Sequence, residues 1–390
     1  MRSTAPDSKD ARLPGGEPAA TSPEGARGGT DSPDRARLTI DLDALAHNRA
    51  VIAEAAAGAE VAAVVKADGY GLGAGPIARR LHAEGTRSFF VARVAEGETL
   101  RAELGDRPAD IYVLDGLLPG TADRQAAAGL TPVVSTLPQA HAALALAGVR
   151  GGYRIALQVD TGMNRQGLAL EEARTLVAAP RGLRTLDVPL LVSHLGSATD
   201  PAEARNPQQL ARFREARALF PEARASLAAS AGAFLAADYR YDMVRAGISL
   251  FGGGPEERPD PRLKAVVTLT APVLDIRSLQ PGDRVGYGSG FTADRPMRVA
   301  VVAAGYADGV IRGAMGHGYA WAAGARRPLL AVNMDLLVID VGDAAITAGE
   351  HLELLGSNAL LDDLADAAGT VAHEVLVRIS PRAERVYLGA

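Results

Sequence analysis

The chain has no cysteine at any of its 390 positions. Disulfide bonds, thiolate metal sites and a cysteine nucleophile are therefore excluded, and no metal centre is expected. No apolar run approaches the ~20 residues needed to cross a membrane, so no membrane span is predicted. The net charge of -5 provides no basic surface for nucleic acid or an anionic membrane. The missing cysteines agree with a cytoplasmic location.

Lysine is almost as scarce. Of 41 basic residues only three are lysine, at positions 9, 66 and 264. A GC-rich genome produces such a bias wherever any cation is sufficient. Lys66 ends an apolar run, which indicates a task that arginine cannot perform, because arginine stays protonated and cannot form a Schiff base. By its position alone, Lys66 could also be a solvated lysine at the end of a strand.

The first 37 residues are rich in proline, glycine, serine, aspartate and arginine, and they contain no apolar stretch. Such a segment buries too little surface to offset the entropy lost on ordering, so residues 1–37 are predicted to be disordered. They also lack the apolar centre of a secretory signal.

Residues 38–262 predict a barrel of alternating strands and helices. A short strand at 38–42 and a helix at 42–57 are expected first. Eight short apolar runs follow with helical patterns between them, and eight consecutive units favour a closed (β/α)₈ TIM-type barrel over the alternative, a doubly wound α/β sheet. The runs are 61–66, 89–94, 111–114, 132–135, 155–160, 190–194, 226–230 and 243–250.

Residues 263–390 predict a second, mostly β domain. Strand-like segments alternate with turn signals such as Gln-Pro-Gly-Asp at 280–283, and one short helix is expected near 360–368. The expected strands are 266–279, 298–305, 329–341, 351–355 and 375–387.

A barrel of this kind carries its chemistry at the carboxyl ends of its strands. Those ends bring an amine, an imidazole and two guanidinium groups to one face. His194, taken alone, could instead be a core histidine whose hydrogen bonds are satisfied. The residues at the ends are Lys66, Ser135, Asp160 with Arg165, His194, Ser230, and Arg245 with Gly247.

Two glycine-rich segments could bind a phosphate. Lys66 begins the segment Lys-Ala-Asp-Gly-Tyr-Gly-Leu-Gly, whose composition predicts a strand that ends in a tight turn before a helix. Glycine lets the backbone approach a ligand closely, and free amides at a turn attract anions. The second segment contains Gly247 with Ile248 and the glycine triplet at 252–254. The triplet could also be a plain linker between the domains.

Seven motifs resemble those of the alanine racemase family, and they occur in the family's order. The stretch around Lys66, Val-Val-Lys-Ala-Asp-Gly-Tyr-Gly-Leu-Gly, is similar to the family's cofactor-lysine motif. One motif alone would be a weak signal, whereas seven in order are specific, and they imply a barrel followed by a β domain. The motifs lie at 64–73, 159–165, 193–198, 244–252, 285–288, 305–309 and 333–335.

The resemblance implies an amino-acid racemase, an isomerase that depends on pyridoxal 5'-phosphate. Lys66 would bind the cofactor covalently and then act as one acid/base. Tyr287 would be the second acid/base, supplied by the partner subunit of a homodimer. Because a phenol is a poor base at its ordinary pKa of about 10, a cation such as Arg165 or Arg245, acting through His194, would have to favour the phenolate.

The same resemblance implies a residue for each part of the cofactor. Arg245 would face the pyridine nitrogen and weaken the electron sink, which favours return of the proton to Cα. Arg165 would bond the phenolic oxygen and contact the substrate, and His194 would pack by the ring. Tyr306 and Met334 would line the substrate pocket, although both could be core residues of the β domain. The phosphate would be held by Tyr70, Ser230, Gly247 and Ile248.

Five positions depart from the family's pattern. Gln158 stands where some members carry a lysine modified to a carbamate, so no carbamate is expected to support Arg165. Three of the departures, Ala246, Val310 and Asn333, bear on the identity of the substrate more than on the cofactor. The other four are Ala229 for asparagine, Ala246 for proline, Val310 for an aromatic residue and Asn333 for serine.

Alanine is the best candidate for the substrate, and three alternatives remain open. A serine or broad-specificity racemase would keep the fold and the cofactor. A decarboxylase of the same fold is disfavoured, because such enzymes use a cysteine near the C-terminus and this chain has none. A non-catalytic pyridoxal-phosphate carrier would resemble the barrel alone, so the β domain with Tyr287 counts against it. The barrel fold by itself does not distinguish between these functions.

Overall fold

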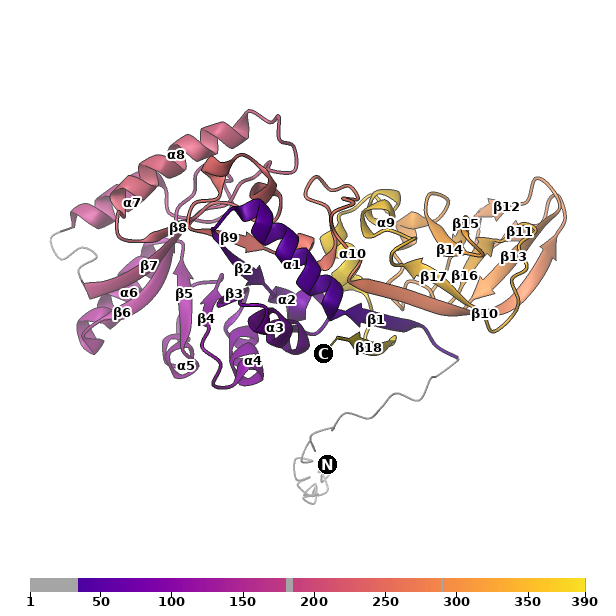
Figure 1. The fold of residues 1–390 in the computed structure, drawn as a ribbon, viewed down its shortest axis with the longest axis horizontal. Helices are drawn as coiled ribbons and strands as arrows, with labels where there is room; N and C mark the ends of the chain where they lie inside the picture. Colours follow the sequence, from indigo (N-terminus) through magenta and orange to yellow (C-terminus); the bar gives the residue numbers. More distant parts are fainter. Residues whose placement is uncertain (1–33, 180–184, 289, 390) are drawn as a thin grey trace, which may run out of the picture. The chain divides into compact units, whose positions relative to one another are not determined.

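The computed structural model describes residues 34–179, 185–288 and 290–389, so most of the segment predicted to be disordered lies outside the described residues. Two eight-stranded sheets organise the described chain, one all parallel and one mixed (Figure 1). Among the described residues, no helix combines the length and apolar character that a membrane crossing requires.

The parallel sheet is a closed barrel. Strands β2 to β8 pair with their neighbours in sequence, and β9 pairs with β2. Backbone hydrogen bonds join β8 to β9, from Asp242 N to Ala225 O (3.1 Å) and from Arg245 N to Ala228 O (3.0 Å). The predicted (β/α)₈ barrel is confirmed. The strands are β2 (Glu60–Val64), β3 (Ser88–Val91), β4 (Asp110–Val113), β5 (Leu130–Val134), β6 (Tyr153–Gln158), β7 (Leu186–Val192), β8 (Arg224–Ser226) and β9 (Met243–Ala246).

Helices connect the barrel strands, except that short 3₁₀ turns take their place after β8 and β9. Asp41 caps the first helix, because its Oδ1 accepts hydrogen bonds from the amides of Asp43 and Ala44 (both 2.9 Å). Inside the barrel Phe90 stacks on Tyr112 at 4.7 Å between ring centroids. The helical segments are α1 (Leu42–Ala56), α2 (Lys66–Tyr70), α3 (Ala74–Ala83), α4 (Val94–Leu104), α5 (Ala122–Ala127), α6 (Leu137–Arg150), α7 (Leu170–Ala178), α8 (Arg205–Leu219), η2 (Ala231–Phe234), η3 (Ala237–Tyr239) and η4 (Ile248–Phe251).

The mixed sheet forms the C-terminal β domain, centred on the long strand β10, which pairs with β1, β17 and β13. Strand β1 was expected at the start of the barrel segment, but it lies in this sheet between β10 and β18. The boundaries at 37 and 262 therefore stay a prediction. The elements are β1 (Arg37–Asp41), β10 (Val267–Leu279), β11 (Arg284–Val285), β12 (Phe291–Thr292), β13 (Met297–Val302), η5 (Arg312–Ala314), β14 (Tyr319–Ala322), β15 (Ala325–Val332), β16 (Leu337–Asp340), β17 (His351–Leu355), α9 (Leu361–Ala367), α10 (Ala372–Arg378) and β18 (Glu384–Leu388).

Two strands of this domain were predicted wrongly. Residues 329–341 form not one strand but the hairpin of β15 and β16. Residues 375–387 form the helix α10 followed by β18. The buried residues of α10 are Ala372, Val375 and Leu376, which have helical spacing, and Pro381 prevents the helix from continuing.

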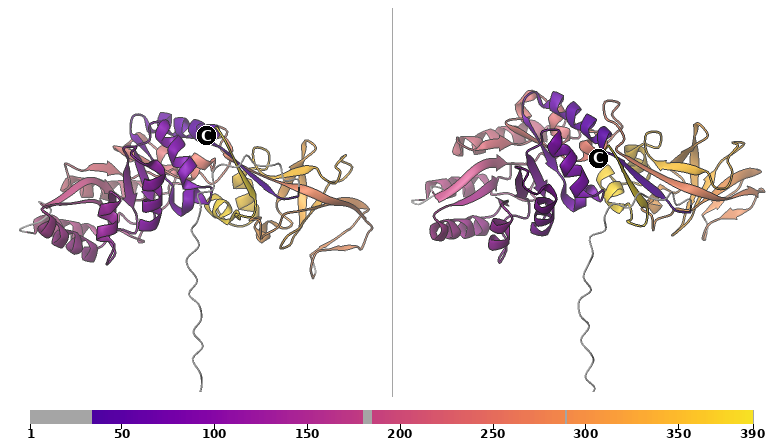
Figure 2. Two further views of the ribbon diagram at one scale, coloured as in Figure 1. Left: turned by 90° about the horizontal axis from the view of Figure 1, so that it is seen from below. Right: turned by 60° about the horizontal axis from the view of Figure 1, so that its bottom comes forward.

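The chain after α10 returns to the barrel and supports the turn that follows Lys66. Arg385 Nη1 donates a hydrogen bond to Gly71 O (2.7 Å), and the hydroxyl of Tyr387 donates to Leu72 O (2.7 Å). Figure 2 shows the C-terminus beside the first helices of the chain. The first and last strands of the described chain, β1 and β18, pair in parallel, and β18 supports the turn that follows Lys66.

Candidate active site

Lys66 lies where β2 ends and a left-handed turn begins. The next four residues, Ala67 to Tyr70, all have φ between 53° and 62°. Such a conformation costs about 1–2 kcal/mol for each residue other than glycine. Tertiary contacts hold the turn, because Glu96 Oε1 accepts from Ala67 N (3.0 Å) and Asp68 Oδ1 accepts from Ala74 N (2.8 Å). The backbone that carries Lys66 is therefore fixed from outside the turn.

The amine of Lys66 is half-buried. Burial lowers the pKa of Lys66, the nearby charge of Arg165 lowers this pKa further, and Glu96 opposes the shift. A lowered pKa raises the fraction of unprotonated amine near neutral pH, and only the unprotonated amine can attack an aldehyde or accept a proton. Burial and this direction of the pKa shift count against a solvated surface lysine.

Arg245 is almost completely enclosed, with 6% of the residue exposed. Its Nη1 donates to the carbonyl (2.8 Å) and the hydroxyl (2.6 Å) of Ser226, and its Nη2 donates to Ser193 O (2.5 Å) and His194 Nδ1 (3.2 Å). These bonds occupy both terminal nitrogens, so the Nε–H is the group left for a ligand. Burial lowers the pKa of Arg245 to about 10, which still leaves a cation at neutral pH.

His194 is a neutral imidazole. Its Nδ1 accepts a hydrogen bond from a guanidinium that can only donate, so its own proton lies on Nε2. Burial and the positive charges of Arg245 and Arg165 lower the pKa of His194 to about 3. The residue is partly exposed and its neighbours are the cations of the site, which distinguishes it from an ordinary core histidine.

A His194→Gln variant is expected to make the fold less sensitive to acid. His194 stays neutral in the folded chain down to a pH of about 3, whereas in the unfolded chain it titrates near 6.5. The unfolded state therefore binds the extra proton as the pH falls through this window, and the wild type loses about 1.4 kcal/mol per pH unit. Thermal melts from about pH 7 to about pH 4 should show a steeper decline for the wild type. Parallel declines would contradict a neutral, buried His194.

Three hydrogen-bond donors surround Gly247. The hydroxyl of Ser230 accepts from Gly247 N (2.9 Å) and Ser249 N (3.3 Å), so its hydrogen is left to donate elsewhere. A Cβ at Gly247 would lie 2.4 Å from the hydroxyl oxygen of Tyr70, so glycine is required there. Burial raises the pKa of Tyr70, which keeps its hydroxyl protonated. With the amide of Ile248, these groups form a cradle suited to an anion.

The glycine triplet at 252–254 does not belong to this cradle. The amide of Gly254 donates to Asp362 Oδ2 (2.9 Å) at the start of α9. A Cβ on Gly254 would lie 1.6 Å from Arg258 O. The triplet therefore allows close packing between the two domains, in agreement with the linker alternative.

His373 of α10 lies beside the site, and the sequence alone did not single it out. Its ring centroid is 5.8 Å from that of Tyr70, and burial together with the charge of Lys66 lowers the pKa of His373. The available signal was the helical spacing of the buried residues of α10. That spacing predicts a helix, but nothing in the sequence brings this helix to Lys66.

The remaining predicted site residues lie on loops of the β domain. Tyr287 is 87% exposed, Met334 54% and Tyr306 44%, which counts against a core role for the last two. In a single chain the predicted site residues therefore form two groups, one at the barrel end and one on the β domain.

The positions that depart from the family pattern have different structural surroundings. Gln158 Nε2 donates to Gln166 O (3.0 Å), and Gln166 Nε2 donates to Ser135 Oγ (3.1 Å), so neutral amides support the loop that carries the exposed Arg165. Val310 is buried in a hydrophobic cluster that includes residues of the barrel and of the β domain. Ala229 forms an isolated bridge with Arg245, and Asn333 is half-exposed next to Met334.

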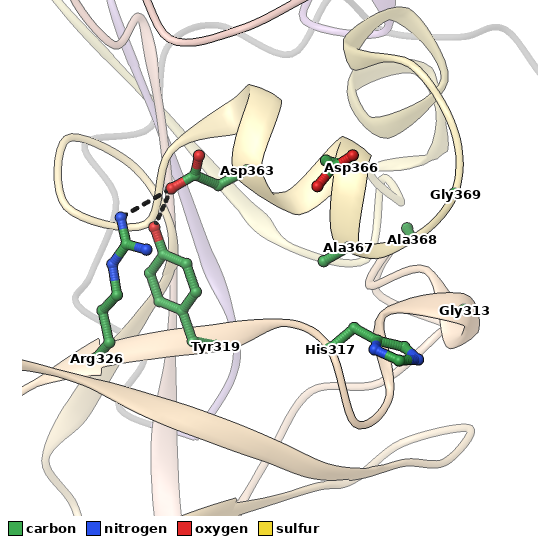
Figure 3. A pocket seen from close by; sticks show the side chains of 9 residues that line it. All are labelled: Gly313, His317, Tyr319, Arg326, Asp363, Asp366, Ala367, Ala368 and Gly369. Atoms are coloured by element: carbon green, nitrogen blue, oxygen red, sulfur yellow. Dashed lines mark hydrogen bonds and ion pairs between the residues drawn. The ribbon is translucent and has the colours of Figure 1, made fainter.

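A cavity of about 710 Å³ lies away from all of these residues, in the β domain (Figure 3). One of its two carboxylates is already paired, because Asp363 Oδ2 accepts from the hydroxyl of Tyr319 (2.7 Å) and from Arg326 Nη2 (2.9 Å). None of the predicted site residues lines this cavity. The lining residues are Gly313, His317, Tyr319, Arg326, Asp363, Asp366, Ala367, Ala368 and Gly369.

The barrel, the half-buried Lys66 and the cradle suited to an anion are together typical of enzymes that use a lysine amine next to a bound anionic group. Within that class, two family models match the chain: "Alanine racemase, N-terminal domain" over residues 40–255 and "Alanine racemase, C-terminal domain" over residues 266–387. The chain belongs to the alanine racemase family.

Individual relatives agree with the family models. An alanine racemase of Methylobacterium sp. is 42% identical over 362 residues, covering 92% of this chain and 99% of the relative. A catabolic alanine racemase of Agrobacterium fabrum is 40% identical, covering 90% of this chain and 92% of the relative. The crystal structure of alanine racemase from Bartonella henselae with covalently bound pyridoxal phosphate matches with a TM-score of 0.86 at 33% identity, covering 91% of this chain and 99% of that chain.

Proposed function

We propose that this chain is a pyridoxal 5'-phosphate-dependent alanine racemase, an isomerase that interconverts L- and D-alanine. The observation that carries the proposal is the half-buried Lys66, whose pKa is lowered beside the neutral His194 and the enclosed Arg245. The relatives that are 42% and 40% identical support alanine as the substrate.

The residues at the barrel end fit pyridoxal phosphate group by group. Lys66 would hold it through its aldehyde, and the cradle of Tyr70, Ser230, Gly247 and Ile248 would hold its phosphate. When bound, the cofactor supplies an electron sink that makes Cα–H of an amino acid acidic. The remaining Nε–H of Arg245 suits the pyridine nitrogen, and the Arg165 guanidinium suits the phenolic oxygen and the substrate carboxylate.

Racemisation needs one acid/base on each face of Cα. Lys66 serves one face, and Tyr287 from the partner subunit of a head-to-tail homodimer serves the other. The exposure of Tyr287, Tyr306 and Met334 in one chain supports this arrangement, because side chains that complete a neighbouring site must stand free of their own chain. A cytoplasmic location stays a prediction.

Exchange of the Cα hydrogen with deuterated solvent tests the function. The holoenzyme is incubated with L-alanine, D-alanine and L-serine, and deuterium at Cα is read together with product chirality. Exchange in both directions, fastest for alanine, is expected. Exchange for none of the three, with cofactor bound, would contradict the racemase and leave a carrier. Loss of carbon dioxide would identify a decarboxylase.

Serine racemisation is the second candidate, and Asn333 favours it. The amide of Asn333 is half-exposed next to Met334, where it can bond the hydroxyl of a substrate. A pocket disfavours a substrate with one added hydroxyl by only about 10²-fold, unless the pocket is shaped to exclude that hydroxyl. Faster exchange for L-serine than for alanine in the same assay would therefore move the assignment to a serine racemase.

A further inference from the structure

Two loops of the β domain carry the residues proposed to line the substrate pocket. The Tyr306 loop comprises residues 305–310, and the Met334 loop comprises residues 333–336. Tyr306 N donates to Asn333 O (3.0 Å) and Ala307 N donates to Met334 O (2.9 Å). A Cβ at Gly305 would lie 2.3 Å from both of these carbonyl oxygens. The two loops are therefore in direct backbone contact.

A buried carboxylate organises the Tyr306 loop. Asp308 is 3% exposed, and its Oδ2 accepts from the amide of Gly305 (2.8 Å). Its carbonyl accepts from Ser380 N (3.1 Å) in the chain after α10. A buried charge destabilises a fold unless a counter-charge accompanies it. The partner of Asp308 is therefore a structural requirement of this loop.

Arg382 is that partner, and it also contacts the second loop. Its Nε and Nη2 donate to the two carboxylate oxygens of Asp308, each at 2.7 Å, in a two-pronged pair. Its Nη1 donates to Asp335 Oδ1 (2.6 Å), the residue after Met334. Both carboxylates raise the pKa of Arg382, so the side chain is a permanent cation. One guanidinium thus joins the two loops and the C-terminal chain.

We propose that Arg382 is a positioning residue for the substrate pocket: its guanidinium sets the separation of the Tyr306 loop and the Met334 loop, and thereby the width of the pocket that admits a small side chain. This inference rests on the proposed function, because Tyr306 and Met334 are pocket residues only in a racemase. Its Nε, Nη1 and Nη2 all donate to carboxylates of the chain, so its role is one of positioning.

The two ion pairs of Arg382 differ in strength. The pair with Asp308 is a two-pronged bond to a buried carboxylate, whereas Asp335 is more than half exposed and its pairing is weakened by solvent. Lysine at position 382 would keep the charge but lose the planar fork that spans both acids. We therefore expect a graded series, with Arg382→Gln most affected, Arg382→Lys intermediate and Asp335→Asn least affected.

Steady-state kinetics of the holoenzyme with L-alanine and L-serine test this role. Arg382→Gln should raise KM for alanine about tenfold and change kcat by less than about threefold. The ratio of kcat/KM for alanine to kcat/KM for serine should fall by about tenfold. The reason is that a looser pocket binds the small substrate less well and tolerates the larger one. Arg326→Gln is the matched control, because Arg326 is a comparably exposed arginine of the same domain that pairs with Asp363. The control should keep wild-type constants.

Backbone hydrogen exchange gives a readout that does not depend on turnover. The amides of Tyr306 and Ala307 should exchange faster in the Arg382 variants than in Arg326→Gln. Kinetic constants equal to those of the control, or a fall in kcat alone that is the same for both substrates, would overturn the positioning role. If Arg382→Gln does not fold, Arg382→Lys and Asp335→Asn decide the same question. A wild type that racemises no amino acid overturns the proposed function, whereas an active wild type with unresponsive Arg382 variants overturns this inference alone.

Discussion

Replacing Lys66 with arginine is expected to lower kcat/KM for alanine racemisation by at least about 10⁴-fold. Arginine keeps the positive charge and is only slightly larger than lysine, but it does not lose its proton at any accessible pH. It can therefore neither bind the cofactor aldehyde covalently nor accept a proton from Cα. Loss of a general acid/base alone costs about 10²–10⁴-fold, and loss of covalent attachment adds to this.

The measurement combines a chiral assay with chemical labelling. Borohydride reduction of the wild-type holoenzyme should remove its visible absorbance and leave the cofactor on the peptide that contains Lys66. Lys264→Arg is the control, because it removes the other lysine of the described chain without touching the site, and it should keep full activity. Label on the Lys264 peptide, or an active Lys66→Arg enzyme, would refute the assignment.

Mixing two inactive variants is expected to restore about a quarter of the active sites. Tyr287→Phe removes the proposed acid/base of one face and should lower turnover by about 10²–10⁴-fold. Lys66→Ala removes the other. After random exchange of equal amounts, half of the dimers are mixed, and each mixed dimer contains one site with both residues intact. The recovered activity should therefore approach a quarter of the wild-type value.

Two measurements make this result specific. Subunit exchange is followed with differently tagged chains, so that a failure to mix is recognised as such. Tyr319→Phe is the control for the loss of a phenol, because its hydroxyl bonds Asp363 within the β domain and away from the site. No recovery after verified exchange would show that both acid/base groups come from one chain. An active Tyr287→Phe homodimer would remove Tyr287 from the mechanism.

The barrel could be predicted from the sequence because its signal is local and repeated. Each of the eight strands ends near a polar or glycine-rich turn, and a parallel strand buried on both faces is an almost continuous apolar run. Strand β1 carries the same local signal, yet it pairs with β10 and β18. Which sheet receives a strand depends on partners more than 200 residues away, and local composition does not contain that information.

The candidate site, like the fold, could be predicted from the sequence only in part. The rarity of lysine and the glycine-rich segment pointed to Lys66, and the strand ends pointed to His194 and Arg245. The sequence did not reveal His373, because the strand predicted at 375–387 covered the last four residues of α10 and hid the helix. It also did not reveal Arg382, since an arginine in an arginine-rich chain carries no compositional signal.

The sequence by itself determined the alternation of strands and helices in the barrel, the scarcity of amines that makes Lys66 conspicuous, and the family to which the chain belongs. These are properties of local patterns and of composition. Only the tertiary structure decided which side chains of the site are charged and which residues pair with each other. The pKa of His194 is low because burial and two guanidinium groups act on it together, and Asp308 tolerates burial because Arg382 reaches it from 74 residues further along the chain. Desolvation and Coulomb interactions depend on distance in space, which the order of residues does not specify.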